Sequence, residues 1–280
     1  MVFNNLDDVK VGSTSIAKVY RGSSLIWQAE TPPTPTEPDW LTMTILSGGT
    51  IMFGHHGGNP YGGTPPNDFY GAIEYKVNDG SWTTLCSSSQ TNYFTVQAND
   101  VVKLRGDAKT ISQATSYGTC YYSSPDEDWD GYMNNFSGST ASFNLSGNIL
   151  SMEYGSGFTG QTVSHLGWEG YGYLFASTNV IDARGMTASG LTQYGGGGGA
   201  EGLFSGCTGL TFATAIGRND FMFVGCSNLS YIKCLDEGTS LAANMWAQGV
   251  SPTGTFVKSA NATWVSGVNG IPTGWTIIDE

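Results

Sequence analysis

The chain has 280 residues, and only 12% of them are charged, about half the usual share for a globular protein. Eleven Lys and Arg against 23 Asp and Glu give a net charge of −12. So few basic side chains cannot replace the counterions of nucleic acid or dock on an anionic membrane, which argues against both partners. Forty glycines without the period of collagen, together with 12% aromatic residues, favour a mainly β protein with many tight turns.

The N-terminal segment, residues 1–28, predicts a small β unit, because short apolar runs are separated by Gly12-Ser13 and Gly22-Ser23. A unit this short cannot bury a core of its own, so we expect it to dock on an assembly. The expected docking side chains are Val9, Val11, Ile16, Val19, Tyr20, Leu25, Ile26 and Trp27. The same stretch lacks the basic end and apolar run of a secretion signal, so we expect no export by that route.

Residues 29–39 contain four prolines and predict an extended spacer between domains. Residues 40–150 then show alternating apolar runs and turns, including Asn78-Asp79-Gly80 between two such runs, which is a strong hairpin signal. This spacing predicts an antiparallel β-sandwich or jelly-roll-like domain, with long loops at 55–67 and 115–138. No apolar run approaches the roughly 18 residues of a membrane span, so we expect no membrane insertion.

A degenerate repeat follows over residues 151–280. Phe175, Phe204 and Phe223 each stand second in a similar phrase, and their spacings fall inside or at the edge of the leucine-rich-repeat range of roughly 20 to 29 residues. Stacked copies would place Phe over Phe and Cys207 over Cys226, which gives both thiols a packing role. Because the five cysteines are odd in number and form no C-x-x-C pair, we expect reduced, mostly buried thiols.

The phrases at 202–210 and 221–229, with the ending 254–275, resemble the BspA-like leucine-rich-repeat proteins of gut Bacteroidota and their crAss-like phages. The opening segment 11–27 is similar to a short module at the start of many phage virion proteins. The resemblance implies a leucine-rich-repeat fold for residues 151–280, a role in surface attachment or adhesion, and no known catalysis. Virion proteins assemble in the reducing host cytoplasm and later face the outside, which fits both the thiols and the missing signal.

These observations predict a bacteriophage virion structural protein, a head or tail fibre or a decoration protein on the outer surface of the particle. Residues 1–28 would dock on other virion proteins, and the β domains would face a host-surface glycan or protein. Analogy with fibres adds a homo-oligomer, most simply a homotrimer. Two alternatives stay open: a bacterial BspA-like cell-surface adhesin, and a glycan-active enzyme, which would need paired carboxylates about 5 to 10 Å apart.

One acidic motif matches the opening of a calcium-binding loop. Asp126, Asp128 and Asp130 alternate and are followed by Gly131, which gives a hard cation oxygen ligands and a turn. The twelfth position is Ser137 where such loops carry Glu, so an acidic, solvated loop tip is the competing interpretation. We expect no other cofactor.

Aromatic residues between glycines are the candidate glycan contacts. Trp168, Tyr171 and Tyr173 alternate with Glu and Gly, a mixture that can stack on sugar rings while binding their hydroxyls. The alternative for any single ring is a place in a core or a subunit interface, and aromatic residues generally favour burial.

Overall fold

The structure is a computed structural model that describes residues 39–54, 73–86, 91–106, 135–154, 171–189, 200–216, 219–234 and 244–280, with short strands at 9–28, 121–122 and 132–133. The chain forms two compact units, Met1–Pro38 and Asp39–Glu280. The described residues are mainly β and contain one four-residue helix, α1 (Ser151–Tyr154). The predicted mainly β class is therefore confirmed.

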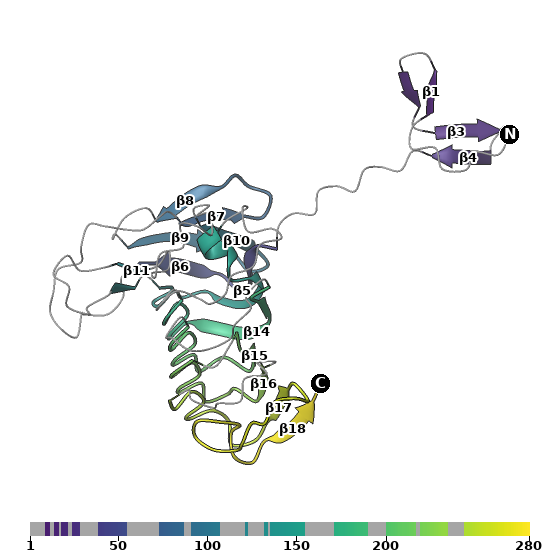
Figure 1. The fold of residues 1–280 in the computed structure, drawn as a ribbon. Helices are drawn as coiled ribbons and strands as arrows, with labels where there is room; N and C mark the ends of the chain where they lie inside the picture. Colours follow the sequence, from purple (N-terminus) through teal and green to yellow (C-terminus); the bar gives the residue numbers. More distant parts are fainter. Residues whose placement is uncertain are drawn as a thin grey trace. The chain divides into compact units, whose positions relative to one another are not determined.

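The unit Met1–Pro38 contains two antiparallel pairs, drawn in purple in Figure 1. Strand β1 (Val9–Val11) pairs with β2 (Thr14–Ile16), and β3 (Lys18–Arg21) pairs with β4 (Ser24–Gln28). The side chains of the eight predicted docking residues lie outside the described part, so their docking role stays a prediction.

The unit Asp39–Glu280 is built on a ten-stranded mixed sheet with the order β18-β17-β16-β15-β14-β13-β5-β10-β7-β8. Its antiparallel half consists of β5 (Leu41–Ser47), β7 (Ile73–Val77), β8 (Thr83–Cys86), β10 (Val101–Gly106) and β13 (Ser142–Asn148). The remaining antiparallel pairs are β6 (Gly49–Phe53) with β9 (Asn92–Val96) and β11 (Tyr121–Tyr122) with β12 (Tyr132–Met133).

The other half of the sheet is parallel (Figure 1). It runs through β14 (Asn179–Thr187), β15 (Phe212–Thr214), β16 (Tyr231–Cys234), β17 (Thr255–Lys258) and β18 (Thr276–Asp279). Strand β13 joins the halves, because it pairs antiparallel with β5 and parallel with β14. Residues on both sides of position 150 therefore contribute to one continuous sheet.

The turns that precede the parallel strands share one geometry and stack on one another. The Phe204 N–H donates to the Met222 carbonyl of the next turn at 2.9 Å, and the Gly206 N–H donates to the Val224 carbonyl at 2.7 Å. Equivalent bonds join the turns before and after this pair. Gly206 has a φ of 75°, a conformation that glycine adopts without the steric cost of a Cβ atom. Each turn with its following strand is called a layer below.

A column of aromatic side chains runs through these layers. Phe175, Phe204 and Phe223 are fully buried and stack in sequence, with ring centroids 5.9 and 5.8 Å apart. The predicted stacking of Phe over Phe is therefore confirmed. Cys207 and Cys226 are also buried, and their Sγ atoms donate to carbonyls of the preceding layer at 2.9 and 3.0 Å. Burial raises the pKa of the Cys207 thiol to about 11.

Two further turns extend the column beyond the predicted repeat. Phe136 stacks on Phe175 at 5.3 Å, and its N–H donates to the carbonyl of Leu174. The Ser139 N–H donates to the Phe136 carbonyl at 3.1 Å, so residues 136–139 form a turn at the end of the predicted loop. At the other end, Trp246 lies 5.7 Å from Phe223 and is followed by the small Ala247. The exchange of a large and a small side chain between adjacent positions keeps the column filled there.

Candidate ligand-binding surface

Most of the predicted metal and glycan-contact residues lie outside the part of the chain that the structure describes. Asp126, Asp128, Asp130 and Trp168 lie outside the described residues. Tyr171 is 1% exposed, so its ring belongs to the core. Tyr173 is half-buried, and its hydroxyl donates to Glu201 Oε1 at 3.1 Å. Over the described ranges, no three His, Cys, Asp or Glu side chains are placed to hold a metal ion, and no helix is long and apolar enough to cross a membrane.

The parallel strands turn alternate side chains to opposite faces of the sheet. Ala183, Ala213, Ile232 and Phe256 form a buried column on one face. The opposite face is called the outer face here. The register aligns one column of outer-face side chains along neighbouring strands, about 4.8 Å apart: Asp182, Phe212, Tyr231, Thr255 and Thr276.

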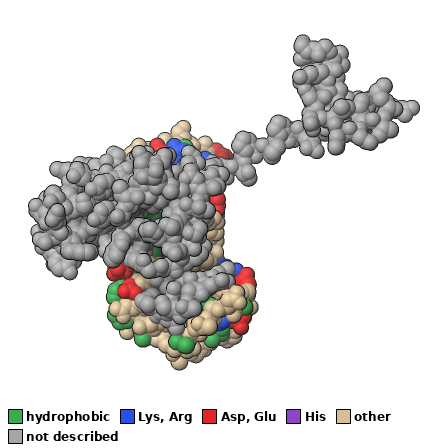
Figure 2. Space-filling model, viewed as in Figure 1, with side chains coloured by type: hydrophobic (Ala, Val, Ile, Leu, Met, Phe, Trp, Pro, Cys, Tyr) green, Lys and Arg blue, Asp and Glu red, His purple; other side chains and the backbone are tan. Residues whose placement is uncertain are grey.

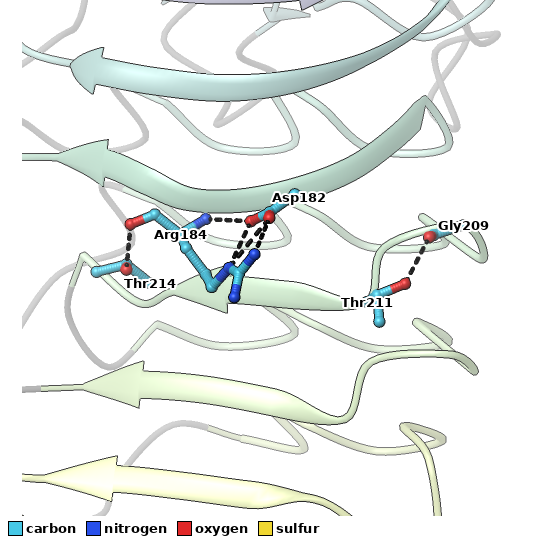
Figure 3. A network of polar contacts seen from close by, with 5 residues as sticks. All are labelled: Asp182, Arg184, Gly209, Thr211 and Thr214. Atoms are coloured by element: carbon cyan, nitrogen blue, oxygen red, sulfur yellow. Dashed lines mark hydrogen bonds and ion pairs between the residues drawn. The ribbon is translucent and has the colours of Figure 1, made fainter. Parts of the chain in front are cut away.

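Strand β14, the first parallel strand in chain order, contributes an ion pair to the outer face (Figure 3). Asp182 and Arg184 are two residues apart, so both side chains point to the same face of the strand. Arg184 Nη2 lies 2.6 Å and Nε 3.0 Å from Asp182 Oδ2, and the Arg184 N–H donates to Asp182 Oδ1 at 2.8 Å. The Thr214 hydroxyl donates to the Arg184 carbonyl at 2.9 Å. The hydrogen bond to Asp182 raises the pKa of Arg184, so the guanidinium stays charged and fixed in orientation.

Two aromatic rings continue this surface. The guanidinium carbon of Arg184 lies 4.1 Å from the ring centroid of Phe212, and the Phe212 and Tyr231 centroids are 6.2 Å apart at 57°. Both rings are half-buried, while the Arg184 side chain is 51% exposed. We call Asp182, Arg184, Phe212 and Tyr231 the platform. It combines partly exposed aromatic carbon with a fixed donor and a fixed acceptor.

The platform could not be recognised from the sequence, because its members come from three strands. Asp182 and Arg184 lie on β14, Phe212 on β15 and Tyr231 on β16, and a stacked turn separates each strand from the next along the chain. Only the register of β14, β15 and β16 brings them together. The sequence did contain one signal: the charged Asp182 and Arg184 flank the small Ala183, an alternation typical of a strand with one exposed face.

Comparison of the chain with protein-family models, with curated proteins and with solved structures finds no match.

Proposed function

We propose that this protein is a bacteriophage virion structural protein, a head or tail fibre or decoration appendage, that adheres to host-surface glycans through the platform. The observation that carries the adhesive part is the platform itself, where a locked Asp182–Arg184 pair lies beside Phe212 and Tyr231. Aromatic faces stack on the apolar faces of sugar rings, while a carboxylate and a guanidinium bind hydroxyls.

The platform favours a neutral glycan over a polyanion. The chain carries a net charge of −12, and among the described residues Lys233, two positions after Tyr231 on β16, has its Nζ 2.7 Å from Glu280 Oε2. Both cations therefore have carboxylate partners, which leaves little positive potential to attract an anionic polymer. A single contact of this kind binds weakly, so adhesion would depend on several copies displayed together.

The same proposal includes the finer fold and the assembly. The Tyr75 ring stacks on Phe94 at 3.9 Å, which joins β7 of the large sheet to β9 of the small one and supports a sandwich for residues 40–150. The repeated layers support a leucine-rich-repeat-like fold for residues 151–280. Residues 1–28 dock on the particle, and the protein forms a homo-oligomer there, as a trimer.

Glycan arrays of neutral hexose-containing glycans test the adhesive part. The parent chain should bind a subset of the array, and Tyr231→Ala and Arg184→Lys should each lower the apparent affinity at least tenfold. Lysine keeps the charge but loses the planar fork that Asp182 orients. Tyr93→Ala is the matched control, because Tyr93 is 75% exposed and lies on β9, away from the parallel strands. A parent chain that binds no glycan, or a Tyr231→Ala variant that binds as the parent does, would refute the platform.

Particle attachment is tested separately. Proteomics and imaging of purified particles should find the protein on their outer surface, and deletion of residues 1–28 should abolish incorporation while glycan binding by the remaining chain persists. Incorporation without those residues would overturn the docking role. An export signal in a longer gene product, with the protein on a bacterial surface, would favour the adhesin instead.

A further inference from the structure

The last layer of the stack, residues 264–280, ends both the column of turns and the parallel half of the sheet. On the turn side, Trp246 Nε1 donates to the Gly270 carbonyl at 2.7 Å, and the Met245 N–H donates to Asn269 Oδ1 at 2.9 Å. On the strand side, β18 pairs with β17. This segment is called the terminal layer below.

The terminal layer exposes apolar side chains that the inner layers bury. Ile232 and Phe256 are 0% exposed, whereas Ile277, the next residue in their column, is 44% exposed. Ile278, Val265 and Val268 are also exposed, so this layer holds four of the six exposed large apolar side chains among the described residues. Figure 2 shows hydrophobic side chains, in green, at this lower end of the molecule. End layers of stacked repeats normally present a polar outer side, so this one has the character of an interface.

The free edge of β18 presents hydrogen-bonding groups in a defined order. The Thr276 N–H donates to the Gly254 carbonyl at 2.8 Å, and the Glu280 N–H donates to the Lys258 carbonyl at 2.9 Å. Residues 276, 278 and 280 therefore face β17, and the N–H and C=O groups of Ile277 and Asp279 point to the opposite edge. No strand among the described residues pairs with that edge.

We propose that a second copy of this chain pairs with the first through β18, antiparallel and about a two-fold axis. Of the registers that a two-fold allows, the one that pairs Ile277 with Asp279 of the second copy uses every outward group and places Ile278 opposite Ile278 of the second copy. This register packs Ile278 against Ile278 of the second copy, and it places Ile277 opposite Asp279 of the second copy.

The charges at this edge permit the pairing. Carboxylates on an edge strand usually prevent self-association. Here Asp279 Oδ1 lies 2.6 Å from Lys258 Nζ, and Glu280 Oε2 lies 2.7 Å from Lys233 Nζ, so each carboxylate is balanced within its own chain. Because these carboxylates already pair with lysines of their own chain, they offer a basic partner little attraction. For the same reason they cause little repulsion between two copies of this strand. The pairing would extend the sheet and turn both outer faces to the same side.

Cysteine cross-linking tests the register. In the proposed dimer, position 278 of one copy lies opposite position 278 of the other as a non-hydrogen-bonded pair. Their Cα atoms are then about 4.5 Å apart, a distance that a disulfide can span. Ile278→Cys in the full chain should therefore form a disulfide-linked dimer under mild oxidation. Thr276→Cys is the matched control on the same strand, because in this register the two copies of position 276 lie about 14 Å apart. Equal cross-linking of the two variants, or none beyond that of the parent chain, would overturn the proposal.

Light scattering after size-exclusion chromatography tests the association without cross-linking. The parent should show at least twice the chain mass of 29.7 kDa, and Ile278→Lys should halve the parent value, whatever contacts residues 1–28 add. Tyr93→Lys introduces the same charge at an exposed position of β9 and should leave the mass unchanged. An Ile278→Lys chain with the parent mass would refute the interface, and this outcome does not depend on glycan binding.

Discussion

Replacement of Phe204 by alanine is the sharpest test of the stacked layers. Its ring is fully buried between Phe175 and Phe223, at centroid distances of 5.9 and 5.8 Å. Truncation of a buried Phe to Ala typically costs about 3–5 kcal/mol, because apolar contact is lost and a cavity remains. Phe204 has an aromatic neighbour on both sides, so we expect a loss of about 4 kcal/mol in the free energy of unfolding. In a unit of this size that loss lowers Tm by roughly 10 °C.

The assay is urea unfolding followed by tryptophan fluorescence, supported by thermal melts. Trp246 lies one layer beyond Phe223, so its emission reports on the same stack. Tyr93→Ala, at a 75% exposed position, should change the free energy of unfolding by no more than about 0.5 kcal/mol. A Phe204→Ala variant that loses less than about 1 kcal/mol would show that the column does not hold the layers together.

Three further predictions concern the layers. A Cβ atom on Gly202 would lie 2.3 Å from Tyr173 Cε1, but one on Gly225 would meet nothing closer than 3.7 Å, and both residues have positive φ. Gly202→Ala should therefore destabilise the protein by about 3 kcal/mol and Gly225→Ala by about 1 kcal/mol in urea unfolding, and equal losses would contradict this. Burial, with a contribution from the Asp220 charge, raises the pKa of Glu201 in the folded protein. The stability that the Glu201 carboxyl contributes is therefore full below the ordinary carboxyl pKa, and it is lost as the pH rises through the pKa of the folded state. Glu201→Gln should thus raise Tm more at pH 7 than at pH 4, and a pH-independent difference would refute the assignment. Burial also raises the pKa of the Cys207 and Cys226 thiols, so iodoacetamide at pH 8 should label them only after denaturation, as site-resolved mass spectrometry can establish.

The part of the fold that could be predicted from the sequence is the part encoded locally. The phrases around Phe175, Phe204 and Phe223 resemble one another because each must form the same turn, and their stacking follows from that. Phe136 was missed because its distance from Phe175 along the chain exceeds the spacing expected of such repeats. Trp246 was missed because the large aromatic residue stands first in its turn and is followed by Ala247, whereas Phe204 and Phe223 stand second in theirs.

Features that depend on strand register could not be predicted. Composition and turn signals place strands, but they do not say that β13 pairs with both β5 and β14. The platform and the exposed end of the stack follow from such pairings. Tyr171 illustrates the same limit, because the sequence shows an aromatic residue among glycines and only the packing shows that its ring is buried.

The position of β5 has a mechanical consequence. The chain enters the unit Asp39–Glu280 at Asp39 and passes directly into β5, which is hydrogen-bonded to β13 on one side and to β10 on the other. A strand at the sheet margin could be peeled away one bond at a time. Force arriving through Asp39 instead acts on two hydrogen-bonded ladders at once, and the bridge between Trp40 and Asn148 adds a contact at the point of entry. In the role proposed above, a load between particle and cell would therefore act on a strand that is hydrogen-bonded on both sides.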